Sequence, residues 1–120
     1  MPNVDTHVLL HAVTGALRPG ERRLLSSDRW SISAIVLSEI AKLAQLGRIE
    51  VDLDDPEVVR ALARVHVWPL TREIARASTH LDIRSDPADE LIAATSVVHN
   101  VPLLTRDPKL LKSKLVPIAR

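Results

Sequence analysis

The sequence predicts an α/β fold of three layers, in which a central, mainly parallel sheet of about five strands is flanked by helices. Short β-branched or apolar runs alternate with amphipathic helical stretches, which is typical of βαβ units. Hydrophobic residues make up 46% of the chain, yet Trp30 and Trp68 are its only Phe, Tyr or Trp residues. The core must therefore be aliphatic, and such a core suits helices packed on a parallel sheet.

The 120 residues fit one domain, 1–120, because a chain of this length can bury a core of its own. No repeat, low-complexity tract or long Gly/Ser linker divides the sequence, and the eight prolines fall near the ends of segments. We therefore expect a single compact unit.

Five segments carry the strand pattern. They are Asn3–Val4, Trp30–Ile32, Val65–Leu70, Val101–Thr105 and Leu115–Ile118. Helical stretches separate them, so successive strands are expected to run parallel and to place their carboxyl ends at one edge of the sheet.

Capping residues and prolines mark the helices between these strands. The predicted helices are one from Ser33 to about Leu46 closed by Gly47, one that starts at Asp54 or Asp55 before Pro56, one over Arg72–Leu81 capped by Thr71, and one from Asp86 and Pro87 to about Asn100, ended by Pro102. These positions give the order of elements and place the polar residues discussed below.

Composition excludes several classes of site. The absence of cysteine rules out disulfides, thiolate metal sites and a cysteine nucleophile, and it fits a reducing compartment. No apolar run approaches the roughly 20 residues that a membrane span needs. The segment Met1–Asp5 lacks the basic and apolar parts of a secretory signal, so we expect a cytoplasmic protein.

The formal net charge of +1 is not the strongly basic balance of many nucleic-acid-binding domains. Contacts with a polyanion would have to come from local patches, although scattered surface cations are the simpler interpretation. The candidate cations are Arg22, Arg23, Lys109, Lys112, Lys114 and Arg120.

Four acidic residues are predicted to lie at the carboxyl edge of the sheet, where ligands gather in open α/β folds. They are Asp5, Glu39, Asp89 and Asp107. Glu39 shares a helix face with apolar Val36 and Leu43, and a carboxylate held there costs several kcal/mol unless something compensates it. Alternatively, Glu39 is solvated and paired with Lys42.

Taken singly, the aspartates also suit helix capping. Asp5 precedes a predicted helix, Asp86 and Asp89 begin another, and Asp107 stands before Pro108. Taken together, converging carboxylates would repel one another and raise one another's pKa unless a cation lies among them. Mg²⁺ or Mn²⁺ is the expected occupant, since hard divalent ions take oxygen ligands.

Other catalytic arrangements find little support. His7 and His11 lie one helical turn apart, but no third ligand stands at the spacing of a zinc motif. There is no Gly-x-Ser-x-Gly motif, and the three glycines do not form a phosphate-binding loop.

Four ordered segments resemble PIN-domain ribonuclease toxins of the VapC type, and the resemblance covers nearly the whole chain. The segments are Val4-Asp5-Thr6-His7-Val8-Leu9-Leu10, Ser38-Glu39-Ile40, Ala88-Asp89-Glu90-Leu91-Ile92-Ala93-Ala94-Thr95 and Leu104-Thr105-Arg106-Asp107. The resemblance implies a PIN-like three-layer fold, Mg²⁺ or Mn²⁺, endonucleolytic cleavage of RNA, and inhibition by a cognate antitoxin protein. A homodimer is expected as well.

The resemblance also implies roles for particular residues. Asp5, Glu39, Asp89 and Asp107 match the acidic site positions, Thr105 matches a hydroxyl residue that orients a water or a carboxylate, and Asp86 matches an auxiliary acid. The chain departs from the family pattern in its short first strand and in Glu90, which adds a charge where relatives often carry a neutral or basic residue.

The mechanism expected on these grounds is metal-assisted hydrolysis of a phosphodiester. Asp5 and Asp89 would be the principal ligands, Glu39 a ligand or a base, and Asp107 a ligand for a second ion. The alternative is a catalytically idle PIN-like module that serves binding or dimerisation. A phosphoacceptor receiver domain would need paired acids after its first strand, and this chain has only Asp5 there.

Overall fold

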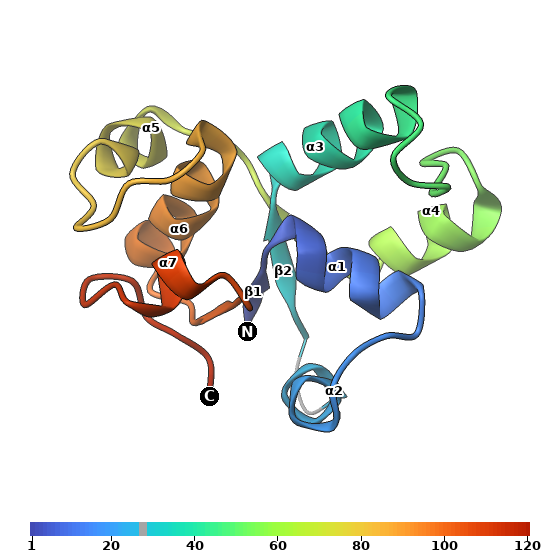
Figure 1. Ribbon diagram of the computed structural model, residues 1–120, viewed down its shortest axis with the longest axis horizontal. Helices are drawn as coiled ribbons and strands as arrows, with labels where there is room; N and C mark the ends of the chain where they lie inside the picture. The colour runs from blue at the N-terminus through green and yellow to red at the C-terminus, as the bar shows by residue number, and fades with distance from the viewer. Residues whose placement is uncertain (27–28) are drawn as a thin grey trace.

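The computed structural model describes residues 1–26 and 29–120. Its sheet has four parallel strands in the order β3-β2-β1-β4. The strands are β1 (Asn3–Val4), β2 (Ser31–Ser33), β3 (His66–Trp68) and β4 (Leu103–Leu104). The parallel sheet predicted from the sequence is confirmed, and β1 lies between β2 and β4. Figure 1 shows β1 beside β2.

The fifth predicted strand, Leu115–Ile118, is wrong as a strand. Only an isolated bridge between Leu103 and Ile118 forms there. The Leu103 N–H donates to the Pro117 carbonyl at 2.7 Å, and Leu103 accepts from Ala119 N–H at 2.9 Å. Pro117 has no N–H to donate, which restricts pairing to this single contact.

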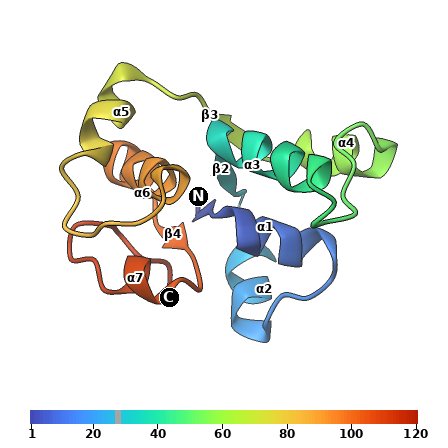
Figure 2. The ribbon, with the colours of Figure 1, turned by 45° about the horizontal axis from the view of Figure 1, so that its top comes forward.

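Helices cover both faces of the sheet. They are α1 (Thr6–Val13), α2 (Pro19–Ser26), α3 (Ala34–Gln45), α4 (Pro56–Leu62), α5 (Arg72–Ser78), α6 (Pro87–His99) and α7 (Pro108–Leu111). Both ribbon views place α5, α6 and α7 on one side and α1 to α4 on the other (Figures 1 and 2). The three-layer arrangement is therefore confirmed.

Side chains that accept a backbone N–H cap most helix starts, as expected. They are Asp5 for α1, Ser33 for α3, Asp55 for α4, Thr71 for α5 and Asp107 for α7. Asp86 is an exception, since it occupies the cap position of α6 but its side chain makes no capping hydrogen bond. The predicted helix start at Asp86 is therefore confirmed, but the side-chain capping bond expected of Asp86 does not form.

One helix boundary needs correction, and one helix was not predicted. The predicted helix to Leu81 ends at Ser78, because the Thr79 hydroxyl donates to the Arg76 carbonyl and the His80 ring contacts the same carbonyl. These contacts satisfy the free carbonyl of the last turn and end the helix. The sequence analysis did not predict α2, whose polar run leaves only Leu24 and Leu25 as apolar residues.

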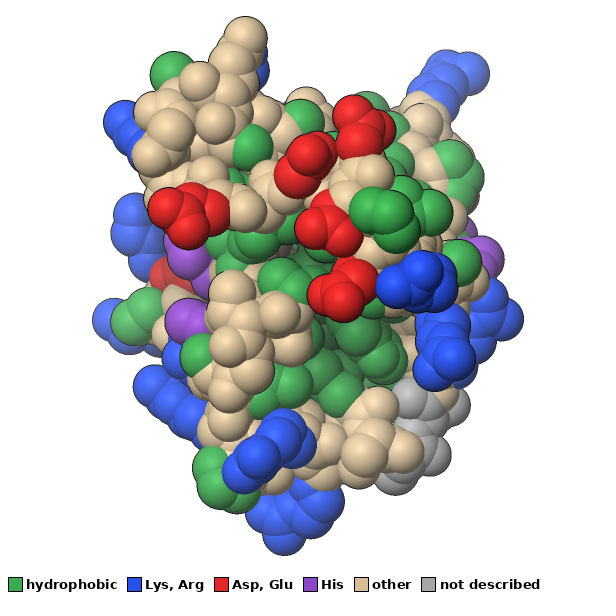
Figure 3. All heavy atoms as spheres, turned by 90° about the vertical axis from the view of Figure 1, so that its right-hand side faces the viewer, with side chains coloured by type: hydrophobic (Ala, Val, Ile, Leu, Met, Phe, Trp, Pro, Cys, Tyr) green, Lys and Arg blue, Asp and Glu red, His purple; other side chains and the backbone are tan. Residues whose placement is uncertain are grey.

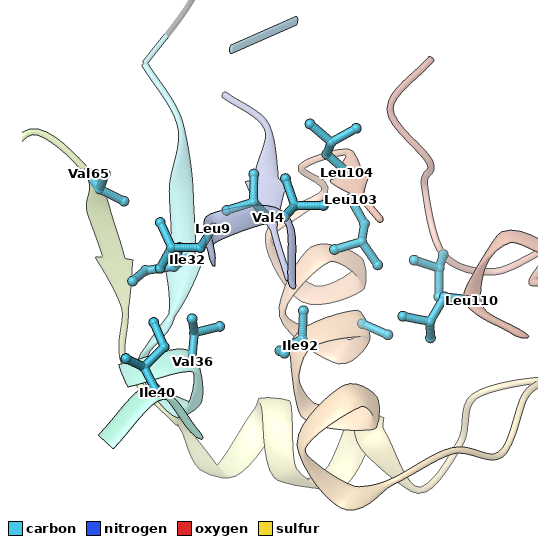
Figure 4. Packing of buried hydrophobic residues seen from close by; sticks show 13 residues of the cluster. Val4, Leu9, Ile32, Val36, Ile40, Val65, Ile92, Leu103, Leu104 and Leu110 are labelled. Atoms are coloured by element: carbon cyan, nitrogen blue, oxygen red, sulfur yellow. The ribbon is translucent and has the colours of Figure 1, made fainter. Parts of the chain in front are cut away.

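The core is aliphatic, as composition required. Val4 and Ile32 on the central strands meet Val36 of α3 and Ile92 of α6, and all four are fully buried (Figure 4). Buried Asn3 ties β1 to α6, because its amide donates to the Ile92 carbonyl at 3.3 Å and to the Ser96 hydroxyl at 3.0 Å. These contacts fix α6 against the strand that leads into Asp5.

Across the described residues, no helix combines the length and the apolar character needed to cross a bilayer.

On the side where α4 lies, the surface gathers hydrophobic side chains in a hollow bordered by acidic ones (Figure 3). A cavity there is lined by apolar Ile49, Val51 and Leu53 and by acidic Glu50, Asp52 and Asp54, together with Ala41 and Ala44.

Candidate active site

The acidic residues named from the sequence come together beyond the carboxyl ends of the neighbouring strands β1 and β4. Asp5 directly follows β1, Asp107 follows β4, and Asp89 lies in the first turn of α6. Together they line a cavity of about 320 Å³, which we call the acidic cavity; its lining is Asp5, His7, His11, Asp89, Arg106, Asp107 and Pro108. Glu39, on α3, adjoins this group through Thr6.

Asp5 is the most buried of these acids, with 5% of its surface exposed. One carboxylate oxygen accepts the Val8 N–H at 2.9 Å, and the other accepts the Thr105 hydroxyl at 2.5 Å. Burial raises the pKa of Asp5, while the bonds from Thr105 and Val8 and the nearby His7 lower it and Asp107 raises it further. The net effect is a carboxylate that is costly to ionise where it stands.

Thr105 links two of the acids. Its hydroxyl donates to Asp5 and accepts the Asp107 N–H at 3.0 Å, so one side chain sets the position of both residues. Thr105 itself is buried. The structure thus places Thr105 where it can orient a carboxylate.

Glu39 is half-buried, and its carboxylate accepts the hydroxyl of buried Thr6. Burial is the main cause that raises the pKa of Glu39, and Asp89 and Asp5 add to the rise. Lys42 bonds Gln45 at 2.7 Å, and no ion pair between Lys42 and Glu39 is found among the described residues. The structure therefore does not support a solvated pair between Glu39 and Lys42.

Asp89 is also half-buried and accepts the Ser85 hydroxyl at 3.1 Å. Burial raises its pKa first, and Asp107, Asp86 and Asp5 raise it further. Glu90 accepts the Ser85 N–H at 3.4 Å, so it holds the turn before α6 rather than facing solvent alone.

The donor set suits a hard divalent cation. Burial first, and then other acids of the group, raise the pKa of Asp5, Glu39 and Asp89, and carboxylate oxygens gathered in this way are the ligands that a hard divalent ion takes. Within residues 1–26 and 29–120, however, no three Asp, Glu or His side chains stand close enough to hold one ion together. The chemistry of the donors fits, and binding would have to draw the carboxylates closer.

Sequence reasoning missed Arg106 and Glu21. The Arg106 guanidinium, at the wall of the acidic cavity, donates to both oxygens of Glu21 on α2, at 2.8 and 2.6 Å. Arg106 lowers the pKa of Glu21 to about 2. Arg106 could have been noticed, because it separates Thr105 from Asp107, whereas nothing local in the sequence marks buried Glu21.

The spacing of His7 and His11 in the sequence did not match a zinc motif. The structure places both in the lining of the acidic cavity, one turn apart on α1. His7 lowers the pKa of Asp5 and of Glu39 through its charge. Both histidines therefore belong to the surroundings of the acids.

Solved structures of similar fold are known. A toxin-antitoxin complex from Klebsiella pneumoniae aligns with a TM-score of 0.75 and 19% identity, covering 99% of this chain and 97% of that chain. VapBC2 from Rickettsia felis, bound to a DNA fragment from their promoter, aligns with a TM-score of 0.73 and 16% identity, covering 98% and 96%. FitAcB from Neisseria gonorrhoeae gives 0.72 and 19%, covering 100% and 97%.

These structural similarities establish the fold. No curated protein matches the sequence significantly. The sequence does match the family model of the PIN domain over residues 3–114, a span that includes all four acidic positions. The resemblance stated from the four motifs is confirmed, and the chain belongs to the PIN-domain family.

Proposed function

We propose that the protein is a metal-dependent endoribonuclease that hydrolyses RNA phosphodiester bonds. The observation that carries this proposal is the convergence of Asp5, Glu39 and Asp89, each with a raised pKa, beside Asp107 at the carboxyl edge of a parallel sheet. Membership of the PIN-domain family supports it.

Asp5 and Asp89 would be the principal metal ligands, with Asp107 as a ligand for a second ion and Glu39 as a ligand or a base. When bound, Mg²⁺ or Mn²⁺ supplies positive charge beside the scissile phosphate and makes a water easier to deprotonate. A carboxylate whose pKa is raised is a stronger base than an ordinary one, which suits Glu39 to accept a proton from water.

The remaining residues position these acids. Thr105 holds one oxygen of Asp5 and the backbone of Asp107, while Thr6 holds Glu39 and Ser85 holds Asp89. Each acid thus has a hydroxyl partner or a backbone contact that fixes its direction. Such fixed donors and acceptors favour catalysis, because little reorganisation is needed during the reaction.

We propose further that the protein is the toxin of a toxin-antitoxin pair, that it acts in the cytoplasm as a homodimer, and that residues 1–120 form one nuclease domain. The solved structures similar to it include toxin-antitoxin complexes, which supports an antitoxin partner for this chain. Expression without an antitoxin should arrest growth, and an Asp5→Asn variant should not. Growth arrest by both proteins would show that toxicity does not depend on the acids.

A catalytically idle PIN-like module is the second candidate. It is favoured by one observation, namely that no three metal-ligating side chains are already grouped within the described part of the chain. Calorimetry distinguishes the candidates, because a nuclease site should bind Mn²⁺ in the wild type and bind it more weakly after Asp89→Asn. An idle module should show no Mn²⁺ binding that depends on Asp89.

The direct test of the proposed activity is incubation of purified protein with total RNA and Mg²⁺, followed by mapping of the new 5′ ends. Internal cleavage at defined positions, absent with EDTA, is expected. Cleavage that persists in EDTA, or no cleavage under any divalent ion, would refute the proposal.

A further inference from the structure

A second cavity, of about 730 Å³, lies between α2 and the C-terminal residue. Its lining is Arg18, Gly20, Glu21, Arg23, Leu24 and Arg120, and we call it the basic cavity. Arg18, Arg23 and Arg120 are exposed to solvent. In both ribbon views the C-terminus and α2 lie at the same end of the molecule (Figures 1 and 2).

The one acid in this lining does not offset the three arginines. Both carboxylate oxygens of Glu21 are taken up, because they accept Arg106 at 2.8 and 2.6 Å and the Arg18 backbone N–H at 2.7 Å. Glu21 is 8% exposed. With its charge matched by Arg106, the positive charge of Arg18, Arg23 and Arg120 dominates the basic cavity.

The same ion pair joins the two cavities. Glu21 lines the basic cavity and Arg106 lines the acidic cavity, and their side chains are in direct contact. The two cavities are therefore adjacent, and a strand in the acidic cavity would have to extend only past the Arg106–Glu21 pair to reach the basic cavity. Guanidinium groups match the geometry of phosphate oxygens, and the phosphate backbone is the part of a nucleic acid that such groups bind.

We propose that the basic cavity is a subsite for the phosphodiester backbone of single-stranded RNA, adjacent to the acidic cavity. This inference deepens the proposed function and rests on it. The subsite binds backbone phosphates through its guanidinium groups, and the Glu21 carboxylate does not oppose them because Arg106 already holds it. It supplies positive charge that the chain as a whole, at +1, lacks.

The test is the salt dependence of RNA binding in EDTA, with a fluorescent single-stranded RNA whose integrity is checked afterwards. Each phosphate contact contributes about 0.7 to the magnitude of the slope of log K against log salt concentration. The loss of one contact therefore weakens binding about fivefold at roughly 0.1 M salt. The double variant Arg18→Gln, Arg23→Gln should therefore lower the slope by about 1.4 and weaken binding on the order of 25-fold. Single-stranded DNA of the same sequence should respond alike.

Arg22→Gln is the matched control, because Arg22 is an exposed arginine of the same helix that does not line the basic cavity. Its slope should stay close to that of the wild type. A double variant that binds with the wild-type slope would overturn the subsite. So would an Arg22→Gln variant whose slope falls by half as much as that of the double variant, or by more.

Cleavage of RNA by the wild type with Mg²⁺ is scored separately. If the wild type cleaves RNA and the double variant keeps the wild-type slope, the subsite is wrong and the proposed function stands. If the salt dependence of RNA binding is weaker for the double variant than for the wild type, but the wild type never cleaves RNA, the subsite stands and the nuclease proposal is wrong. A wild type that binds no RNA overturns the subsite.

Discussion

Replacing Glu21 by Gln tests the ion pair that fastens the segment carrying Thr105 and Asp107 to α2. The pKa of Glu21 is lowered from 4.5 to about 2, chiefly by Arg106, so the ionised carboxylate stabilises the folded state. That shift corresponds to about 3 kcal/mol at neutral pH. Because the Arg106 side chain keeps 24% exposure, screening reduces the effect, and we expect a loss of roughly 1 to 3 kcal/mol for Glu21→Gln.

The pH dependence has a definite sign. A lowered pKa contributes stability that is fully present above the ordinary value of 4.5 and is lost as the pH falls towards 2. The difference in unfolding free energy between wild type and Glu21→Gln should therefore be constant from pH 7 to about pH 5, fall to about half near pH 3, and vanish at still lower pH. The titration of the other acids contributes equally to the unfolding free energy of both proteins, so it cancels in this difference as long as the substitution leaves those acids unaffected.

Urea unfolding at pH 7, 5 and 3 measures the difference. Glu73→Gln is the matched control, because Glu73 also stands in the first turn of a helix, α5, and is exposed. The control removes the same favourable charge at a helix N-terminus, which is worth about 0.3 to 1 kcal/mol. Equal losses for the two variants at pH 7, or a gap for Glu21→Gln that persists undiminished at pH 3, would refute the assignment of the stability to the ion pair.

Three further substitutions test other parts of the site. Asp5→Asn should make the metal-free protein more stable at pH 7 in thermal melts, because burial raises the pKa of Asp5 above its ordinary value of 3.8 and the acid therefore costs stability at any pH above that ordinary value. Saturating Mg²⁺, which at a hundredfold excess over Kd adds about 2.7 kcal/mol to the wild type, should add less to the variant. Thr105→Val removes the hydroxyl that donates to buried Asp5 and should cost about 2 kcal/mol in urea unfolding, and an unchanged stability would show that this bond contributes nothing. Asp86→Ala should change stability by less than about 0.5 kcal/mol, since Asp86 makes no side-chain cap; a loss near 1 kcal/mol would indicate a capping bond in solution.

The fold could largely be predicted because its signals are local. Ser33, Thr71 and the Asp107–Pro108 pair mark helix starts through capping chemistry, and an apolar run marks β4. The prediction of a strand at Leu115–Ile118 was wrong because an apolar run does not reveal whether a neighbouring strand has free backbone N–H and C=O groups to pair with. Only one bridge, between Leu103 and Ile118, forms there.

The acids of the site could be named from their positions, but their partners could not. Thr105 and Asp5 are 100 residues apart, and Arg106 and Glu21 are 85 apart, so only the folded chain brings these pairs together. Glu21 in particular lies in a helix whose residues are mostly polar, so its burial is not marked by its neighbours in the sequence. Long-range polar contacts of this kind carry no periodicity that a sequence pattern would expose.

The central claim is that the acidic cavity is the catalytic site of a metal-dependent ribonuclease. The most direct test is the single-turnover rate of RNA cleavage at saturating Mg²⁺ for wild type, Asp89→Asn and, as a control, Asp54→Asn, whose carboxylate is exposed and outside the acidic cavity. Loss of a charged ligand should remove at least about 2 to 3 kcal/mol of transition-state stabilisation, on the order of a hundredfold in rate. We expect that loss for Asp89→Asn and a rate within about twofold of wild type for Asp54→Asn. Wild-type cleavage by purified Asp89→Asn would contradict the account.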